Sequence, residues 1–540
     1  MSPTVEHLVV APILLPLVTA ALMVPLPERL RTVKAAIALL STLGTVGIAV
    51  ALLGIADAGA PDSASTISVY LLGNWQAPFG IVLVVDRLSA LMLTLTGITV
   101  MAGLIFSITR WHSAGSYFHA LVQFMLAGLN GVFLTGDLFN LFVFFEVLLA
   151  ASYGLALHGS GVLRVKAGLH YIAINLAASA LFLIGVSLIY GSTGTLNMAD
   201  LAARIPAVPA SERVLLEAGA AILGIAFLIK AGMWPLCFWL PATYSVAAPP
   251  VAAMFAILTK VGIYAILRLW LLLFGAGAGA SAGFGHEWLL IGGIATVLFG
   301  LVGLLASQDL ARLASYSVLV SSGTLLATIA VGNEGVTGGA LFYLVVSTLS
   351  LAAFFLLIEL FERGRIAGAD MIAVTLEAFG DDDEKEIEPV GIAFPATMAI
   401  LGIGFAVCAL LLAGLPPLSG FIAKFLMLTA LFQLPDPSQN AMPWLLMALL
   451  LVSGMVVLFA LMRAGIRVFW VPVESNVPTV RFLELLPIVS LLALCVGLTV
   501  NAEPAARFMQ ATAHDLFLPE TYVKRVLSAP SVERSLEERP

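Results

Sequence analysis

Charged residues are scarce in this chain of 540 residues, where Asp, Glu, Lys and Arg together make up 11% of the sequence. Soluble domains carry about 25% of such residues. Apolar runs of about eighteen or more residues recur along the whole chain instead, which is the pattern of membrane-spanning helices. The composition therefore excludes a chain of soluble domains and predicts an all-α polytopic membrane protein. The first apolar run lacks a basic segment and a clear cleavage site, so we expect a retained span.

Cysteine is almost absent, and the groups that hold redox cofactors are missing. Cys237, Cys408 and Cys495 lie in separate apolar segments without ligand spacing, and we expect no disulfide among them. The sequence has no cysteine cluster, no pair of haem ligands and no GxGxxG motif on a strand–helix unit. We therefore expect no cofactor, no metal site, no enzymatic chemistry in the chain itself and no nucleic-acid partner.

The apolar runs between polar breaks predict about fourteen spans. They lie near residues 8–26, 35–55, 82–107, 117–135, 138–157, 167–190, 214–240, 247–274, 288–306, 312–331, 336–361, 392–433, 443–470 and 481–501. Lys and Arg gather in loops that follow odd-numbered spans, as at Arg29, Arg164 and Arg463, and this bias predicts that these loops are cytoplasmic. Both termini are then expected on the outer side of a bacterial inner membrane.

One strongly charged stretch interrupts the apolar pattern. The segment 364–391 contains "LEAFGDDDEKEIEP" and falls on the predicted cytoplasmic side. Its acidic residues do not contradict the orientation, because the charge bias counts Lys and Arg. The segment is interpreted either as a solvated linker or as a docking site for another subunit, and the sequence leaves both interpretations open.

Four ionisable residues lie well inside predicted spans, where such a group costs at least about 2.5 kcal/mol unless it is paired or hydrated. They are Glu146, Lys230, Lys260 and Lys424. One carboxylate cannot pair with three lysines, which argues against a purely structural set. The alternatives are a static ion pair between Glu146 and Lys230, and lysines that extend toward the membrane interface. A carboxylate beside amines whose charge state can change would form a proton relay.

Other polar residues could extend such a path. Lys260, Tyr264 and Arg268 are spaced i, i+4, i+8 and share one helix face. That face could line a hydrated route to the outside or form a polar seam between helices. Asp137 lies at the outer end of the fifth span, where a helix cap is the default interpretation. Asp137 and Asn140 could supply ion ligands but do not define a Na⁺ site.

Two predicted spans are interrupted beside a lysine. Proline removes a helical hydrogen bond, and irregular backbone at membrane depth is tolerated where it is buried in protein or lines a water-filled cavity. The two spans lie five spans apart and run in opposite directions, which indicates an inverted repeat. Ordinary proline kinks are the alternative. The interrupting residues are Pro235 and Pro241 after Lys230, and Pro416 and Pro417 before Lys424.

The inverted repeat divides the chain into four parts. Residues 1–116 hold three N-terminal spans, and residues 117–275 form the first repeat with spans four to eight. Residues 288–470 form the second repeat with spans nine to thirteen and the acidic segment. Residues 481–540 hold the last span and a C-terminal tail.

The stretch "KAGMWPLCFWLPATYSVAAPPVAAMFAILTKVGIYAILR", residues 230–268, resembles the antiporter-like membrane subunits of respiratory complex I, membrane-bound hydrogenases and Mrp cation/proton antiporters. "GDLFNLFVFFEVLLAASYGL", "YGSTGTLNMADLA", "SQDLARLASYS" and "GLPPLSGFIAKF" fit this family in the same order. The resemblance covers residues 80 to 470. It is strongest to the D-type branch of the Mrp antiporters (also called Pha or Mnh), because complex I relatives usually have His where Cys237 stands.

The resemblance implies about fourteen helices, with the seventh and twelfth broken. It also implies a proton path through Glu146, Lys230, Lys260 and Lys424 that is coupled to Na⁺ or K⁺ movement. Relatives often have His or Lys where Ser321 and Val346 stand in the second repeat. The route to Lys424 is therefore expected to use Ser321, Ser347 and water.

Family membership further implies work within a lipid-embedded complex, beside subunits of the A, B, C, E, F and G types. The leading interpretation is a subunit of a monovalent cation (Na⁺ or K⁺)/proton antiporter. A proton-translocating subunit of a complex I-like NADH:quinone oxidoreductase or a membrane hydrogenase is the runner-up. An inert scaffold, whose buried charges only hold helices together, is the third interpretation.

Overall fold

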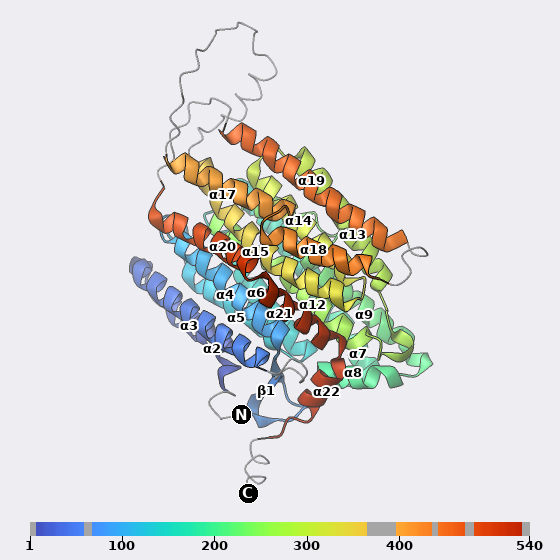
Figure 1. Cartoon of the computed structure of the whole chain (residues 1–540). Helices are drawn as coiled ribbons and strands as arrows, with labels where there is room; N and C mark the ends of the chain where they lie inside the picture. The colour runs from blue at the N-terminus through green and yellow to red at the C-terminus, as the bar shows by residue number, and fades with distance from the viewer. Residues whose placement is uncertain (1–6, 59–66, 364–395, 435–440, 470–479, 532–540) are drawn as a thin grey trace, which may run out of the picture.

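A computed structural model describes residues 7–58, 67–363, 396–434, 441–469 and 480–531. The helices lie side by side in one bundle (Figure 1). Eleven of the described helices are long and apolar enough to cross a membrane, and four shorter apolar helices accompany them. This confirms the all-α membrane fold. The acidic segment 364–391 lies outside the described residues.

The helices follow the predicted spans closely. In the first half they are α2 (Ala11–Met23), α3 (Arg31–Asp57), α4 (Arg87–Ser107), α5 (Phe118–Leu134), α6 (Leu138–Ala156), α7 (Val162–Thr193), α8 (Met198–Arg204), α9 (Ala210–Ala231), α10 (Trp239–Val246), α11 (Pro249–Phe255) and α12 (Leu258–Phe274). In the second half they are α13 (His286–Ala306), α14 (Leu310–Ile329), α15 (Glu334–Glu362), α17 (Ala396–Ala413), α18 (Ser419–Phe432), α19 (Ala441–Phe469), α20 (Phe482–Val500), α21 (Ala502–Phe517) and α22 (Pro519–Leu527).

The two ends of the bundle differ. One end carries a short antiparallel hairpin, β1 (Ser68–Leu71) and β2 (Val82–Val85), and we call it the hairpin face. The opposite end carries the Lys- and Arg-rich loops, and we call it the basic face. There Arg164 donates to the carbonyl of Val246, and Arg463 donates to the carbonyl of Ser307. Arg164 lies at the start of α7 and Arg463 near the end of α19, so these bonds tie helix ends to chain segments that are distant in sequence.

The two predicted repeats share a packing pattern. Helix α5 packs against α6 and α7 against α9, as α13 packs against α14 and α15 against α18. Helix α5 starts at the basic face and α13 starts at the hairpin face, so corresponding helices run in opposite directions. The most apolar stretches of α11–α12 and of α15 are completely buried, which places these helices at the centre of the bundle.

Three of the described crossings are interrupted beside a lysine. The chain leaves α9 at Gly232 and α17 at Gly414, both with φ of 73° in the left-handed region that glycine adopts without strain. Pro235 lies in the first break, and Pro416 and Pro417 lie in the second, as predicted.

The prediction for Pro241 was wrong, because Pro241 lies in the first turn of α10, where the missing N–H costs no helical hydrogen bond. A third interruption, which the sequence did not predict, lies at residues 256–257 between α11 and α12, shortly before Lys260.

The C-terminal tail forms two helices, α21 and α22, that the sequence did not predict. Helix α21 continues the course of α20, and both pack along α15 (Figure 1). Helix α22 then packs against α8 near the hairpin. The last segment of the chain therefore covers part of the hairpin face.

Candidate ion path

Lys260 lies at the centre of the bundle and its side chain is fully buried. Its Nζ atom donates a hydrogen bond of 2.9 Å to the Oγ atom of Ser321 on α14. Ser321 in turn donates to the Oγ atom of Ser347 on α15, at 3.0 Å. Ser321 and Ser347 were predicted to serve Lys424, whereas their hydrogen bonds lead to Lys260. An amine and two hydroxyls therefore connect the first repeat to the second.

Lys230 lies in the last turn of α9, beside the first helix break. Its Nζ atom is buried and finds no hydrogen-bond acceptor among the described residues. It lies 4.7 Å from the centroid of the Phe145 ring, a cation–π distance that gives a charged amine partial compensation. An amine without an acceptor is the kind of group whose charge state follows its surroundings.

Glu146 follows Phe145 on α6 and is half-buried. Its Oε1 atom accepts a hydrogen bond from the hydroxyl of Ser179 on α7. The ion pairs of the described residues do not join Glu146 to Lys230, so the static-pair alternative is not what the structure shows. The carboxylate is instead held by a neutral hydroxyl close to the lysine.

A small cavity borders Lys230. It offers about 20 Å³ to the centre of a water molecule, which is room for one water. Asn175 and Tyr171 from α7 add polar groups to an otherwise apolar wall. Leu258 and Val261, which flank Lys260 on α12, complete the lining. A water here would lie between the helices that carry the two lysines.

Lys424 lies in α18, just after the second break, and is 7% exposed. Its Nζ atom donates to the carbonyl of Ala413 at 3.0 Å, and to the carbonyl of Leu450 and the Oγ atom of Ser453 at 3.3 Å each. Ala413 ends α17, where carbonyl groups have no helical partner. The break therefore supplies an acceptor for this lysine.

Asp137 and Asn140 have a structural role in the described chain. The Oδ1 atom of Asp137 accepts from the backbone N–H of Asn140 at 2.9 Å and caps the start of α6. Asn140 donates its side-chain amide to Thr135. Among the described residues no group of three or more His, Cys, Asp or Glu could hold a metal ion.

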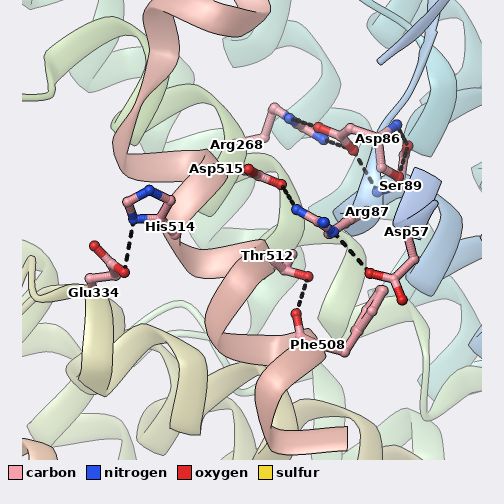
Figure 2. A network of polar contacts seen from close by, with 10 residues as sticks. All are labelled: Asp57, Asp86, Arg87, Ser89, Arg268, Glu334, Phe508, Thr512, His514 and Asp515. Atoms are coloured by element: carbon pink, nitrogen blue, oxygen red, sulfur yellow. Dashed lines mark hydrogen bonds and ion pairs between the residues drawn. The ribbon is translucent and has the colours of Figure 1, made fainter. Parts of the chain in front are cut away.

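The face of Lys260, Tyr264 and Arg268 ends in an ion pair that the sequence analysis missed. Arg268 donates to both carboxylate oxygens of Asp86, at 2.5 and 2.7 Å (Figure 2). The Tyr264 hydroxyl donates to the carbonyl of Phe133 at 2.8 Å. Asp86 also caps α4 through the backbone N–H of Ser89. Burial opposes ionisation of Asp86, but the charge and hydrogen bonds of Arg268 prevail and lower the pKa of this carboxyl.

The residues of this path lie within a region with known relatives. Residues 135–457 match the NADH:quinone oxidoreductase/Mrp antiporter transmembrane family. A protein of Rhizobium meliloti (strain 1021), named as the probable D-type subunit of a K(+)/H(+) antiporter, is 60% identical over 535 residues, which cover 98% of this chain and 99% of that protein. The chain belongs to this family.

A second curated relative and two solved structures also resemble this chain. The D-type subunit of the Na(+)/H(+) antiporter of Alkalihalophilus pseudofirmus is 37% identical over 467 residues, which cover 85% of this chain and 88% of that protein. A chain in the structure of the Mrp complex from Dietzia sp. DQ12-45-1b superposes with a TM-score of 0.80 at 25% identity, over 98% of this chain and 100% of that chain. A chain of respiratory complex I from Thermus thermophilus shares the fold, with a TM-score of 0.70 at 24% identity over 94% of this chain and 99% of that chain.

Proposed function

We propose that this chain is the D-type membrane subunit of a multisubunit K⁺/H⁺ antiporter, and that its buried ionisable residues carry protons. The K⁺ assignment rests on the name of the relative at 60% identity, whereas the relative at 37% identity is named a Na⁺/H⁺ antiporter subunit. In this proposal the chain works with subunits of the A, B, C, E, F and G types, in a bacterial inner membrane.

One observation carries the proposal. The three lysines are buried within membrane-spanning helices, and none forms an ion pair with a described carboxylate. Each lies directly beside an interrupted helix. A scaffold would gain more from paired or apolar side chains, because an unpaired amine in a span is costly. If the amines can lose and regain a proton, proton transfer explains why such costly groups lie inside the spans.

The order of groups suggests how protons would move. Glu146 lies at the half-buried surface of α6, and Lys230 lies near it beside a cavity for one water. Lys260 lies on α12, whose Leu258 and Val261 line that cavity, and its hydroxyl partners lead into the second repeat. Lys424 occupies the equivalent break there. A proton shift at one site changes the electrostatic cost of charge at the next, which couples the sites.

The positive charge of the loops supports the orientation. Arg29, Arg164 and Arg463 lie at the basic face, which is therefore proposed to face the cytoplasm. The start of α2 and helix α22, which lie near the two ends of the chain, are then on the outer side (Figure 1). The acidic segment 364–391 would be cytoplasmic.

The test uses the assembled complex in proteoliposomes. Addition of K⁺ or Na⁺ to vesicles that hold a pH gradient reports exchange by the collapse of that gradient. Complexes with Glu146→Ala, Lys230→Ala or Lys260→Ala are expected to assemble and to lose exchange. If all three exchange at the wild-type rate, the relay is wrong. If Na⁺ supports exchange better than K⁺, the assigned ion is wrong. A gradient formed only when a quinone reductant is supplied would favour the redox-driven runner-up.

A further inference from the structure

Lys260, Tyr264 and Arg268 share one side of α12, and this row of side chains runs toward the hairpin face of the bundle. At that end the buried ion pair between Arg268 and Asp86 closes the row. Asp86 is 6% exposed and Arg268 is 8% exposed. Both carboxylate oxygens accept from the guanidinium, and the backbone N–H of Ser89 adds a third bond. Both oxygens of the Asp86 carboxylate therefore already have hydrogen-bond donors and gain little from contact with water. Water from this side would have to separate the pair before it could reach Tyr264 and Lys260.

A layer from the other end of the chain covers the pair. The ring of Tyr522 on α22 lies 5.4 Å from the Cζ atom of Arg268, and the ring of Tyr264 lies 5.7 Å from it. Tyr522 is 7% exposed. Its hydroxyl lies beside Gly136, in the link between α5 and α6, since a Cβ atom there would be 3.3 Å from it. Tyr522 thus packs between the ion pair and the loops of the hairpin face.

Helix α21 holds this cover in place. Asp515 accepts a hydrogen bond of 2.8 Å from the Nη1 atom of Arg87, the residue after Asp86, and Asp57 accepts from the Nε atom of Arg87 at 3.2 Å (Figure 2). His514, the residue before Asp515 on α21, meets Glu334 at the start of α15, with 3.1 Å between Nδ1 and Oε1 (Figure 2).

We propose that the Asp86–Arg268 ion pair is the outlet gate of the Lys260 path at the hairpin face, and that helices α21 and α22 hold it closed. The proposal rests on the proposed function, because a gate needs a path behind it. Tyr522 is the cover and Asp515 is the anchor. Opening means that Arg268 separates from Asp86 while Tyr522 moves aside.

The charges suit a gate better than a simple brace. While Arg268 and Asp86 are paired, the two charges satisfy each other and attract little water. Once separated, each charge needs water, so opening of the pair and hydration of the route go together. A brace between α4 and α12 could be built from apolar side chains at similar or better stability. The Tyr264 hydroxyl and the Lys260 amine lie behind the pair on the same side of α12, so the pair can close the route to them.

The test measures passive leak instead of exchange. Assembled complexes in proteoliposomes receive a pH gradient in choline medium, which has no exchangeable cation, and the decay of the gradient is followed. Tyr522→Ala is expected to raise the leak about fivefold, the factor for loss of one partly desolvated cation–π contact. Tyr522→Phe keeps the ring and should leak like the wild type. Asp515→Asn weakens the anchor, and complexes with this variant should leak to an intermediate extent. This variant provides the test if the Tyr522→Ala complex fails to assemble.

A labelling experiment reports on access. Ser321→Cys places a thiol behind the gate, and a membrane-impermeant thiosulfonate is applied from the hairpin face. The thiol should be protected unless Tyr522→Ala is also present. Glu503→Gln is the matched control on α21, because Glu503 forms only an exposed pair with Arg507 at 3.8 Å. This control should neither leak nor expose the thiol.

The outcomes separate the gate from the path. Wild-type leak and full protection in assembled Tyr522→Ala and Asp515→Asn complexes would overturn the gate. The Lys260→Ala exchange assay reports on the path independently. Loss of exchange there, together with an unchanged leak in the Tyr522 variant, would leave the path standing and remove the gate.

Discussion

The Nζ atom of Lys260 on α12 and the Oγ atom of Ser321 on α14 are 2.9 Å apart, and this bond joins the last helix of one repeat to the second helix of the other. In Ser321→Ala the lysine would lose its acceptor in a buried site. A hydrogen bond to a charged group contributes about 1.5–3 kcal/mol, so exchange should slow about tenfold or more.

The control for this variant is Ser317→Ala on the same helix. Ser317 is also buried, but its hydroxyl donates only to the carbonyl of Leu313. Its removal should leave exchange near the wild-type rate. Proteoliposome exchange assays at matched complex content provide the comparison, and equal rates in the two variants would contradict the role of Ser321.

Gly454 leaves space for the amine of Lys424. A Cβ atom there would lie 3.1 Å from Nζ of Lys424 and 2.6 Å from the carbonyl oxygen of Ala413. Gly454→Ala should therefore displace the lysine and weaken exchange, with an overpacking cost of about 1–3 kcal/mol in stability. Gly497→Ala is the matched control, because its Cβ would meet no atom within 4 Å. Loss of exchange in both variants, or in neither, would count against a placed amine at this break.

Glu484 ties three helices together at the basic face. Its Oε1 atom accepts from Arg363 at 2.6 Å and from Thr109 at 2.9 Å, and its Oε2 atom accepts from the backbone N–H of Arg481. The Glu484 side chain is 2% exposed. Glu484→Ala would remove this partner of Arg363, which keeps its pair with Glu359 at 2.9 Å, and should lower the free energy of unfolding by about 1.5–3 kcal/mol.

Thermal unfolding of the purified complex in detergent measures this loss. Glu503→Gln removes an exposed ion pair and should change stability by less than about 1 kcal/mol. A Glu484→Ala complex as stable as this control would show that the cluster contributes no net stability.

The Asp86 carboxyl predicts a pH dependence with a definite sign. Burial opposes its ionisation, but the neighbouring Arg268 lowers its pKa below the ordinary value of 3.8. A lowered pKa in the folded state gives stability that is fully present above pH 3.8 and is lost as pH falls through the lowered value. The wild type should therefore exceed Asp86→Asn in thermal stability at pH 7.

The difference between the two proteins should shrink as the pH falls below 3.8. Asp57→Asn is the control, because Asp57 is half exposed and contacts Arg87 instead of Arg268. A difference that grows on acidification would contradict the assigned pair.

The sequence predicted the ionisable residues and the helix breaks inside the spans, but it did not predict which residues contact them. The buried lysines and Glu146 were visible because ionisable groups within spans are rare. The breaks were visible because proline ends helices. Ser179 and Ser453 were missed because hydroxyls are common in membrane helices, so nothing in the spacing marks the ones that meet a charge.

Asp86 was missed for a different reason. It lies at the start of a predicted span, where a helix cap explains an acidic residue, and it is indeed a cap. Its pairing with Arg268 depends on how α4 and α12 pack, which periodicity does not encode. The positions of α21 and α22 were not predicted, because their apolar sides are buried only by packing against the rest of the bundle. Both errors concern contacts between segments distant in sequence.

The ion pair between Arg87 and Asp515 also constrains how the protein is made. The two residues are 428 positions apart. At ribosomal speeds of about 5–20 residues per second, Asp515 emerges roughly 20–90 s after Arg87. During that interval α4 must be held in the bilayer with a cation that lacks one of its two final carboxylates. Completion of the hairpin face is therefore among the last events of biosynthesis, and a chain that stops before α21 would remain open on that side.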